Sequence, residues 1–161
     1  VSYPGTVGMY KPFRGAMAKL TADYTLSATL PINGVPWQGV DFDTNAFWSA
    51  GQPARFTIPA GVKKIRLSSM LQFAAGTFSA TASISFNFTK NGSSNFRGNA
   101  SASNVPGYND SGFAITSGVI PVVPVDYFEV RWNTTRTGTA VITEPRSFFS
   151  IEVVEAEETL P

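Results

Sequence analysis

The sequence contains no cysteine and no histidine. Without cysteine, disulfide scaffolds, thiol nucleophiles and cysteine-ligated zinc or iron–sulfur sites are excluded. Without histidine, Ser-His-Asp triads, histidine general bases and histidine metal sites are excluded as well. Catalysis would have to rely on carboxylates, Lys, Tyr, Ser or Thr, and we therefore expect that the protein is not an enzyme.

Charged side chains are also scarce, at 14% of the chain, where about a quarter is usual. The net charge is only +1, so nothing attracts the whole chain to nucleic acid or to an anionic membrane. No apolar run is long enough to span a bilayer, and the first residues lack the basic and apolar regions of a secretory signal. We expect no nucleic-acid partner, no membrane insertion and no secretion by a signal peptide.

Basic residues predominate before residue 100 and acidic residues after it. This asymmetry has two interpretations: opposite-signed faces that meet between subunits, or an acidic C-terminal end with scattered surface charge. Three arginines on or beside strands are expected to pair with acidic side chains, across strands or across subunits. The arginines are Arg66, Arg131 and Arg146, and the acidic candidates are Glu129, Glu144 and Glu152.

The residues that are abundant favour a β protein. Hydrophobic residues make up 43% and aromatic residues 13% of the chain, which also has 14 glycines and 11 prolines. Such a mixture is poor in helix formers and rich in strand and turn formers. Alternation of apolar and polar residues predicts strands at 16–26, 40–42, 54–58, 63–73, 77–90, 115–123, 126–133, 139–143 and 147–155.

These segments predict an all-β sandwich or jelly roll of about eight to ten antiparallel strands. Asn91-Gly92 is the strongest hairpin signal, and 93–112 is predicted to be a long loop. We divide the chain into an extended arm (1–13), a jelly-roll domain (14–155) and an acidic tail (156–161).

Two groups of aromatic and apolar residues lie outside the predicted strands. The arm offers side chains that can dock on a neighbouring molecule or on its own domain: Tyr3, Met9, Tyr10 and Phe13. The loops offer side chains that can face a sugar or a protein partner, or can plug the open ends of the sandwich: Trp37, Phe47, Trp48 and Tyr108.

Two carboxylates, Asp41 and Asp43, flank Phe42. Such a pair can bind a hard cation or act in a glycosidase. The alternative is a structural role in which they cap the turn that follows.

Four segments, taken in order, resemble one family. They are Arg14–Asp23 (RGAMAKLTAD), Phe56–Leu67 (FTIPAGVKKIRL), Gly118–Val122 with Asp126–Val130 (GVIPV, DYFEV), and Phe148–Val154 (FFSIEVV). Together they resemble the small tumour-necrosis-factor/complement-head-like domains of tailed-phage and prophage structural proteins, over roughly 14–155. Two positions depart from the family pattern. The glycine that usually precedes the Asp-Tyr-Phe strand is Val125 here, and the loop after Thr44 lacks the histidine often found there.

The resemblance implies a ten-strand jelly roll that assembles as a tight homotrimer. On this basis we assign five residues of the last long strands to packing in the core or at the trimer contact: Phe128, Val130, Trp132, Phe149 and Ile151. The resemblance also places Asp126 near the three-fold axis, where three copies could bind calcium. The alternative is that Asp126 is a solvated turn residue. No other cofactor is expected.

We therefore expect a non-enzymatic phage virion protein, made in the host cytoplasm and carried on the virion surface. The preferred role is a trimeric capsid decoration protein or short head fibre, with the major capsid protein or another virion protein as partner. The alternative is the receptor-binding knob of a tail fibre or tail needle, which recognises a cell-surface glycan of the host.

Overall fold

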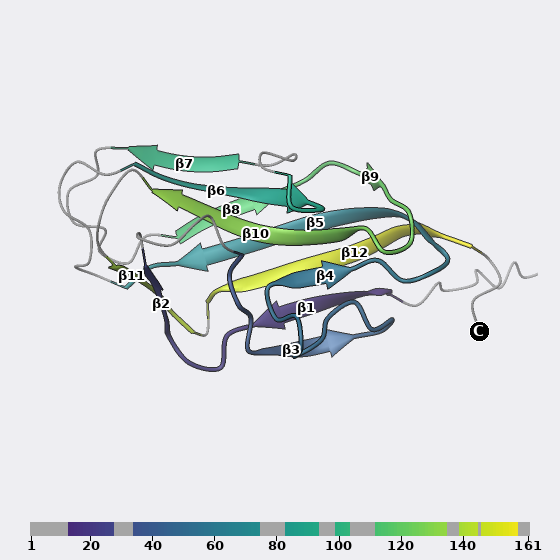
Figure 1. Cartoon of the computed structure of the whole chain (residues 1–161), viewed down its shortest axis with the longest axis horizontal. Helices are drawn as coiled ribbons and strands as arrows, with labels where there is room; N and C mark the ends of the chain where they lie inside the picture. Colours follow the sequence, from purple (N-terminus) through teal and green to yellow (C-terminus); the bar gives the residue numbers. More distant parts are fainter. Residues whose placement is uncertain are drawn as a thin grey trace, which may run out of the picture.

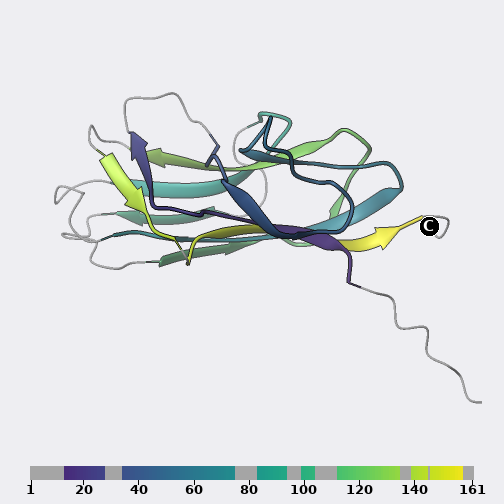
Figure 2. The same ribbon diagram turned by 90° about the horizontal axis from the view of Figure 1, so that it is seen from below.

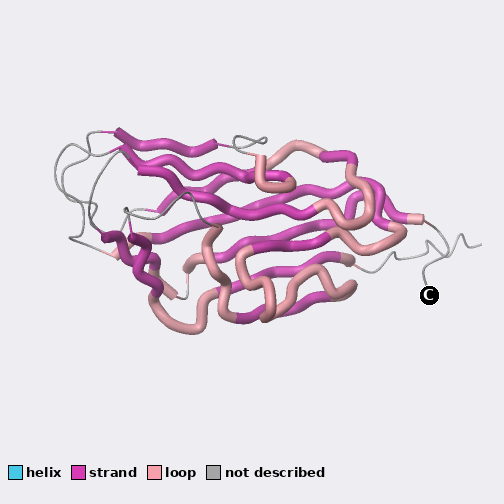
Figure 3. The backbone as a smooth tube through the Cα atoms, in the orientation of Figure 1, coloured by secondary structure: helices cyan, strands magenta, loops and turns pink. Residues whose placement is uncertain are grey.

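A computed structural model of the chain describes residues 13–27, 34–74, 83–93, 99–103, 112–134, 139–144 and 146–157. This part of the chain consists of strands and loops (Figure 3), which confirms the all-β prediction. Its strands are β1 (Gly15–Lys19), β2 (Tyr24–Ser27), β3 (Gly39–Asp43), β4 (Arg55–Thr57), β5 (Val62–Gln72), β6 (Ser83–Lys90), β7 (Asn99–Ser103), β8 (Gly112–Thr116), β9 (Ile120–Pro121), β10 (Tyr127–Thr134), β11 (Thr139–Ile142) and β12 (Phe148–Ala156).

The described strands number twelve, more than the eight to ten expected. Two predicted strands are each divided: 16–26 into β1 and β2, and 115–123 into β8 and β9. The third difference is β7, which lies in the segment predicted as a loop. The sequence of β7, NASAS, has no large side chain to bury, so it lacks the alternation of large apolar residues from which we predicted strands.

The strands form two main sheets and a small third one, and every pairing is antiparallel (Figure 1). The six-stranded sheet has the order β3-β1-β12-β5-β8, with β9 also paired to β5. The four-stranded sheet has the order β4-β10-β6-β7. The pair β11-β2 lies at one end of the molecule, as the edge view shows (Figure 2).

Buried and exposed side chains alternate along most of β5, so one side of this strand faces the core. Ile65, Leu67 and Leu71 are almost fully buried, whereas Lys64 and Arg66, on either side of Ile65, are exposed. Large aromatic rings from both sheets meet in the core. The ring of Phe149 on β12 stacks on Phe56 of β4, with 4.5 Å between the ring centroids. The core therefore lies between the two sheets, as in other β-sandwiches.

A tight turn forms where the sequence predicted one, at Asn91-Gly92. Asn91 and Gly92 have φ angles of 51° and 77°, the left-handed values that a two-residue type I′ turn requires. Lys90 and Ser93 form the closing bridge of this turn, and β6 then pairs with β7. The hairpin prediction at Asn91-Gly92 is confirmed.

The acidic C-terminal end pairs with basic residues of the same chain. Arg66 bonds to Glu152, directly opposite on β12, with 3.0 Å between Nη1 and Oε2. Lys64 pairs with Glu155 at 2.5 Å. The cross-strand prediction for Arg66 is confirmed, and these charges need no second subunit to be compensated. The described residues contain no helix that could cross a membrane.

Candidate functional site

The five residues assigned to packing all lie in the core of a single chain. Phe128, Val130, Phe149 and Ile151 have no exposed surface, and Trp132 is 7% exposed. Their side chains fill the space between the two sheets, so they are already buried before any second copy binds. Of the two roles expected for them, the structure supports core packing.

The outward side of the six-stranded sheet is different, because no described strand packs over it. Two rows of directly opposed residues run across this side, as the registers of β3, β1, β12, β5 and β8 show. All of them are partly or fully exposed. We call the following set the open face: Met17, Phe42, Ser68, Met70, Ala114, Thr116, Phe148 and Ser150.

None of these eight residues is charged. The charged residues beside them pair with one another: Lys19, which lies opposite Phe148 in the second row, pairs with Asp41, and Arg66 pairs with Glu152. Met and aromatic residues are enriched, and charged residues depleted, in the centres of protein–protein contacts. A sheet surface with Met17, Met70 and Phe148 near its centre and with its neighbouring charges paired therefore has the composition of an interaction face.

We did not predict the open face from the sequence, although a signal was present. Met17 and Met70 occupy the strand positions that alternate with core residues, where polar side chains are usual. Phe148 likewise precedes the core residue Phe149. Apolar residues in both registers of a strand indicate that both faces of the sheet are covered in the final assembly.

The loop aromatics are mostly part of the core. Trp37 is 1% exposed and Phe47 2% exposed, and Trp37 packs beside Phe149 with 6.2 Å between the rings. Of the two roles expected for them, the burial of these two residues supports plugging the sandwich. Trp48 is half-buried, and its indole Nε1 donates to the Pro53 carbonyl at 3.1 Å. Tyr108 lies outside the described residues.

Of the arm residues, Phe13 is described, and Tyr3, Met9 and Tyr10 lie outside the described part. Phe13 is 57% exposed. Its ring contacts the edge of Phe42, with 5.4 Å between the centroids. The chain therefore reaches β1 beside the open face and adds an exposed aromatic ring to its margin.

Asp126 is buried and paired, so the expectation of a solvated turn residue is wrong. Its side chain is 6% exposed, and Oδ2 lies 2.7 Å from the Lys90 ammonium. Oδ2 also accepts from the backbone N–H of Val123 at 3.0 Å, and Oδ1 accepts from Asn91 Nδ2 at 2.8 Å. The carboxylate thus ties the turn before β10 to the hairpin turn after β6.

These contacts also bear on the expectation that Asp126 could bind calcium. Burial alone would raise the pKa of Asp126, but the hydrogen bonds from Lys90, Val123 and Asn91 together with the Lys90 charge lower its pKa below the ordinary value of 3.8. The ammonium of Lys90 already compensates the charge of this carboxylate within one chain. Within the described part of the chain, no group of three or more acidic side chains could hold a metal ion.

Asp41 and Asp43 have separate structural tasks. Asp43 accepts backbone N–H bonds from Phe47 at 3.0 Å and Trp48 at 2.9 Å, so it caps the loop that follows β3. Asp41 pairs with Lys19 on the neighbouring strand β1. This arrangement supports the capping interpretation of Asp43 rather than a catalytic pair.

No protein-family model matches the chain, and no curated protein matches its sequence. Solved structures do match it. The chain is similar to the Eiger TNF of S. frugiperda, with a TM-score of 0.57 over 94% of this chain and 99% of that one, at 12% identity. It is also similar to murine APRIL, with a TM-score of 0.60 over 89% of this chain and all of the other, at 16% identity. The likeness concerns the fold, and it confirms the expected TNF-like jelly roll.

Proposed function

We propose that the chain is a non-enzymatic structural protein of a phage virion, which assembles as a homotrimer on the particle surface as a capsid decoration protein or short head fibre. The observation that carries the proposal is the open face. Five of its eight residues are apolar, none of the eight is charged, and no described strand covers them within one chain. A second copy of the same sheet surface is the occupant that the TNF-like resemblance implies.

The charges at the margin support self-association. Because Lys19, Asp41, Arg66 and Glu152 are paired within one chain, a neighbouring copy meets no uncompensated charge there. Burying an unpaired charge would oppose association, because it costs several kcal/mol of desolvation. The phage setting is supported by the four sequence segments that resemble tailed-phage domains. The non-enzymatic role is supported by the lack of cysteine and histidine.

Sedimentation of two charge variants tests the homotrimer. The unaltered chain is expected to sediment as a trimer at micromolar concentration, and Met17→Glu and Phe148→Glu to sediment as folded monomers, because each places a carboxylate at the centre of the contact. Thr57→Glu is the matched control, since Thr57 lies on the other sheet. A stable monomer of the unaltered chain would refute the trimer, as would trimers of both open-face variants.

Electron microscopy of intact particles tests the virion role separately. An antibody against the chain is expected to label three-fold projections on the capsid. Labelling confined to the tail tip would favour the receptor-binding knob, and unlabelled particles would refute the virion role while leaving the trimer intact.

A further inference from the structure

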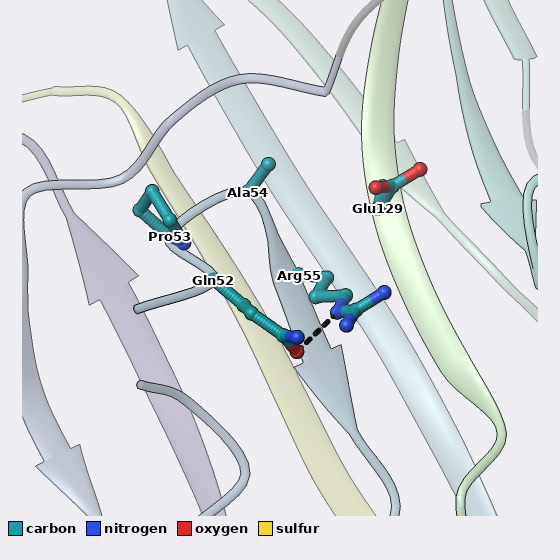
Figure 4. A pocket seen from close by; sticks show the side chains of 5 residues that line it. All are labelled: Gln52, Pro53, Ala54, Arg55 and Glu129. Atoms are coloured by element: carbon teal, nitrogen blue, oxygen red, sulfur yellow. Dashed lines mark hydrogen bonds between the residues drawn. The ribbon is translucent and has the colours of Figure 1, made fainter. Parts of the chain in front are cut away.

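A small hollow lies on the outward side of the four-stranded sheet, where β4 runs beside β10. It has a volume of about 280 Å³ and is lined by Gln52, Pro53, Ala54, Arg55 and Glu129 (Figure 4). Arg55 and Glu129 are directly opposite in the β4–β10 register. Both point away from the core, because the adjacent residues Phe56 and Phe128 point into it and are fully buried.

Glu129 presents one satisfied and one unsatisfied carboxylate oxygen. Oε2 accepts two bonds from Arg131, at 2.7 Å from Nη2 and 2.9 Å from Nε, and a third from Thr89 Oγ1 at 3.3 Å. No described residue donates to Oε1. The side chain is only 13% exposed, so this acceptor is held in one orientation by its partners.

Arg55 is held in a similar way on the other side of the hollow. Its Nε donates to Gln52 Oε1 at 2.7 Å, the bond drawn in Figure 4. Its guanidinium lies over the ring of Tyr127, 4.5 Å from the centroid. The terminal Nη1 and Nη2 groups have no hydrogen-bond partner among the described residues, so their donors remain available at a fixed place.

The apolar part of the hollow is also rigid. The Pro53 carbonyl accepts from the backbone N–H of Trp37 and from Trp48 Nε1, both at 3.1 Å. Gly34 packs closely against two of the lining residues: a Cβ there would come within 2.9 Å of the Ala54 Cβ and 3.4 Å of the Glu129 Cβ. The hollow thus combines a fixed acceptor, fixed donors and an apolar wall, which are the usual components of a ligand site.

We infer that this hollow binds a neutral, hydroxyl-rich ligand, one sugar ring of a glycan. An anion would meet the carboxylate of Glu129, and a cation would meet the guanidinium of Arg55. A hydroxyl both donates and accepts. Of two neighbouring hydroxyls, one can donate to Glu129 Oε1 and the next can accept from Arg55 Nη, while a C–H face of the ring contacts Pro53.

A peptide satisfies this geometry less well. The N–H and C=O of one amide point in opposite directions, whereas Arg55 and Glu129 lie side by side on adjacent strands, with Cβ atoms about 5 Å apart. The hollow is also on the sheet opposite the open face, so self-association through that face leaves it accessible. The inference therefore does not rest on the proposed function.

NMR titration of the full chain tests the inference. The probes are the methyl glycosides of galactose, mannose, glucose and N-acetylglucosamine, each added to about 50 mM, which saturates a millimolar site. At least one glycoside is expected to shift the Arg55 Nε–Hε and Tyr127 ring signals along one saturating curve. Inorganic phosphate and N-methylacetamide are the comparison probes for an anion site and a peptide site.

Two variants and one control identify the groups involved. Arg55→Met keeps most of the side-chain stem, and Glu129→Gln removes the charge of the acceptor. Each is expected to weaken glycoside binding about tenfold or more, because each removes a hydrogen bond to a charged group. Arg66→Met is the matched control on the other sheet and is expected to leave the affinity unchanged. Amide spectra check that each variant is folded, and Arg55→Met alone suffices if Glu129→Gln does not fold.

The results separate the possible occupants. If no glycoside shifts the signals, or if Arg55→Met binds as tightly as the unaltered chain, the inference is wrong. Tighter phosphate binding by Glu129→Gln, with no glycoside binding, would identify an anion site instead. Saturable binding of N-methylacetamide in place of the glycosides would identify a peptide site.

Discussion

Replacing Val125 with glycine should stabilise the protein. Val125 has a φ angle of 68°, in the left-handed region that β-branched residues almost never adopt. Its side chain is 79% exposed, so little packing compensates for the strain. The family that the sequence resembles usually has glycine at this position, and the backbone angle explains why.

The expected change in the free energy of unfolding is the sum of three terms. A non-glycine residue in the left-handed region carries a backbone strain of about 2 kcal/mol, which glycine removes. Against this, glycine loses about 0.7 kcal/mol more backbone entropy on folding, and the partly buried valine side chain gives up about 0.4 kcal/mol. We therefore expect Val125→Gly to raise the free energy of unfolding by about 1 kcal/mol and the Tm by about 2–4 °C.

Val123→Gly is the matched control, because Val123 is also an exposed valine, 60% accessible, in the same turn. It is not among the residues with positive φ, so glycine should lower the Tm of this variant through backbone entropy and the loss of a partly buried side chain, with no strain to relieve. Thermal unfolding at one fixed protein concentration measures both variants, since the Tm of an oligomer depends on concentration. The strain argument is refuted if Val125→Gly lowers the Tm as much as Val123→Gly.

Four further outcomes are expected. Phe149→Ala should lower the free energy of unfolding by about 3–5 kcal/mol in denaturant titration, because the ring is fully buried; a loss below about 1 kcal/mol would contradict its core position. Asp126→Asn should lower the free energy of unfolding by about 2 kcal/mol at neutral pH, because it weakens hydrogen bonds to a charged group. Because folding lowers the pKa of Asp126, its stabilisation is present above the ordinary value and is lost as pH falls through the folded pKa, so the difference between the two proteins should shrink below about pH 4. Calcium should leave the Tm unchanged, and a rise of several degrees that Asp126→Asn abolishes would refute our account of this carboxylate. Deleting residues 1–13 should leave a folded trimer that no longer binds particles, and normal binding by the truncated chain would refute the docking role of the arm.

Much of the fold was predictable because it depends on local patterns. The alternation in β5, β6, β10 and β12 reports which side chains can face a core. Asn91-Gly92 specifies its own turn, because these two residues tolerate left-handed φ angles. Strand β7 escaped prediction because its sequence lacks large apolar residues, and its strand structure is evident only from the pairing of its backbone with β6.

The roles of the candidate site residues were harder to predict from the sequence. The aromatic residues Trp37 and Phe47 lie in loops, and sequence position alone could not distinguish a plug from a ligand-facing ring. Which of these roles a residue takes depends on whether the neighbouring strands leave space for its ring in the core. The ring of Trp37 lies beside Phe149, which itself stacks on Phe56. The role of Asp126 could not be predicted for the same reason, because its partner Lys90 lies at the end of β6, far from it in the sequence.

The sequence by itself determined the β class, the main strands, the Asn91-Gly92 turn and the exclusion of cysteine and histidine chemistry. These depend on residue type and on spacing of a few residues along the chain. Only the tertiary structure decided that the open face is uncovered, that Asp126 is paired and that Arg55 lies opposite Glu129. Each of these depends on strands that are distant in sequence and adjacent in space, and such pairings are settled by the burial of the whole core rather than by any local segment.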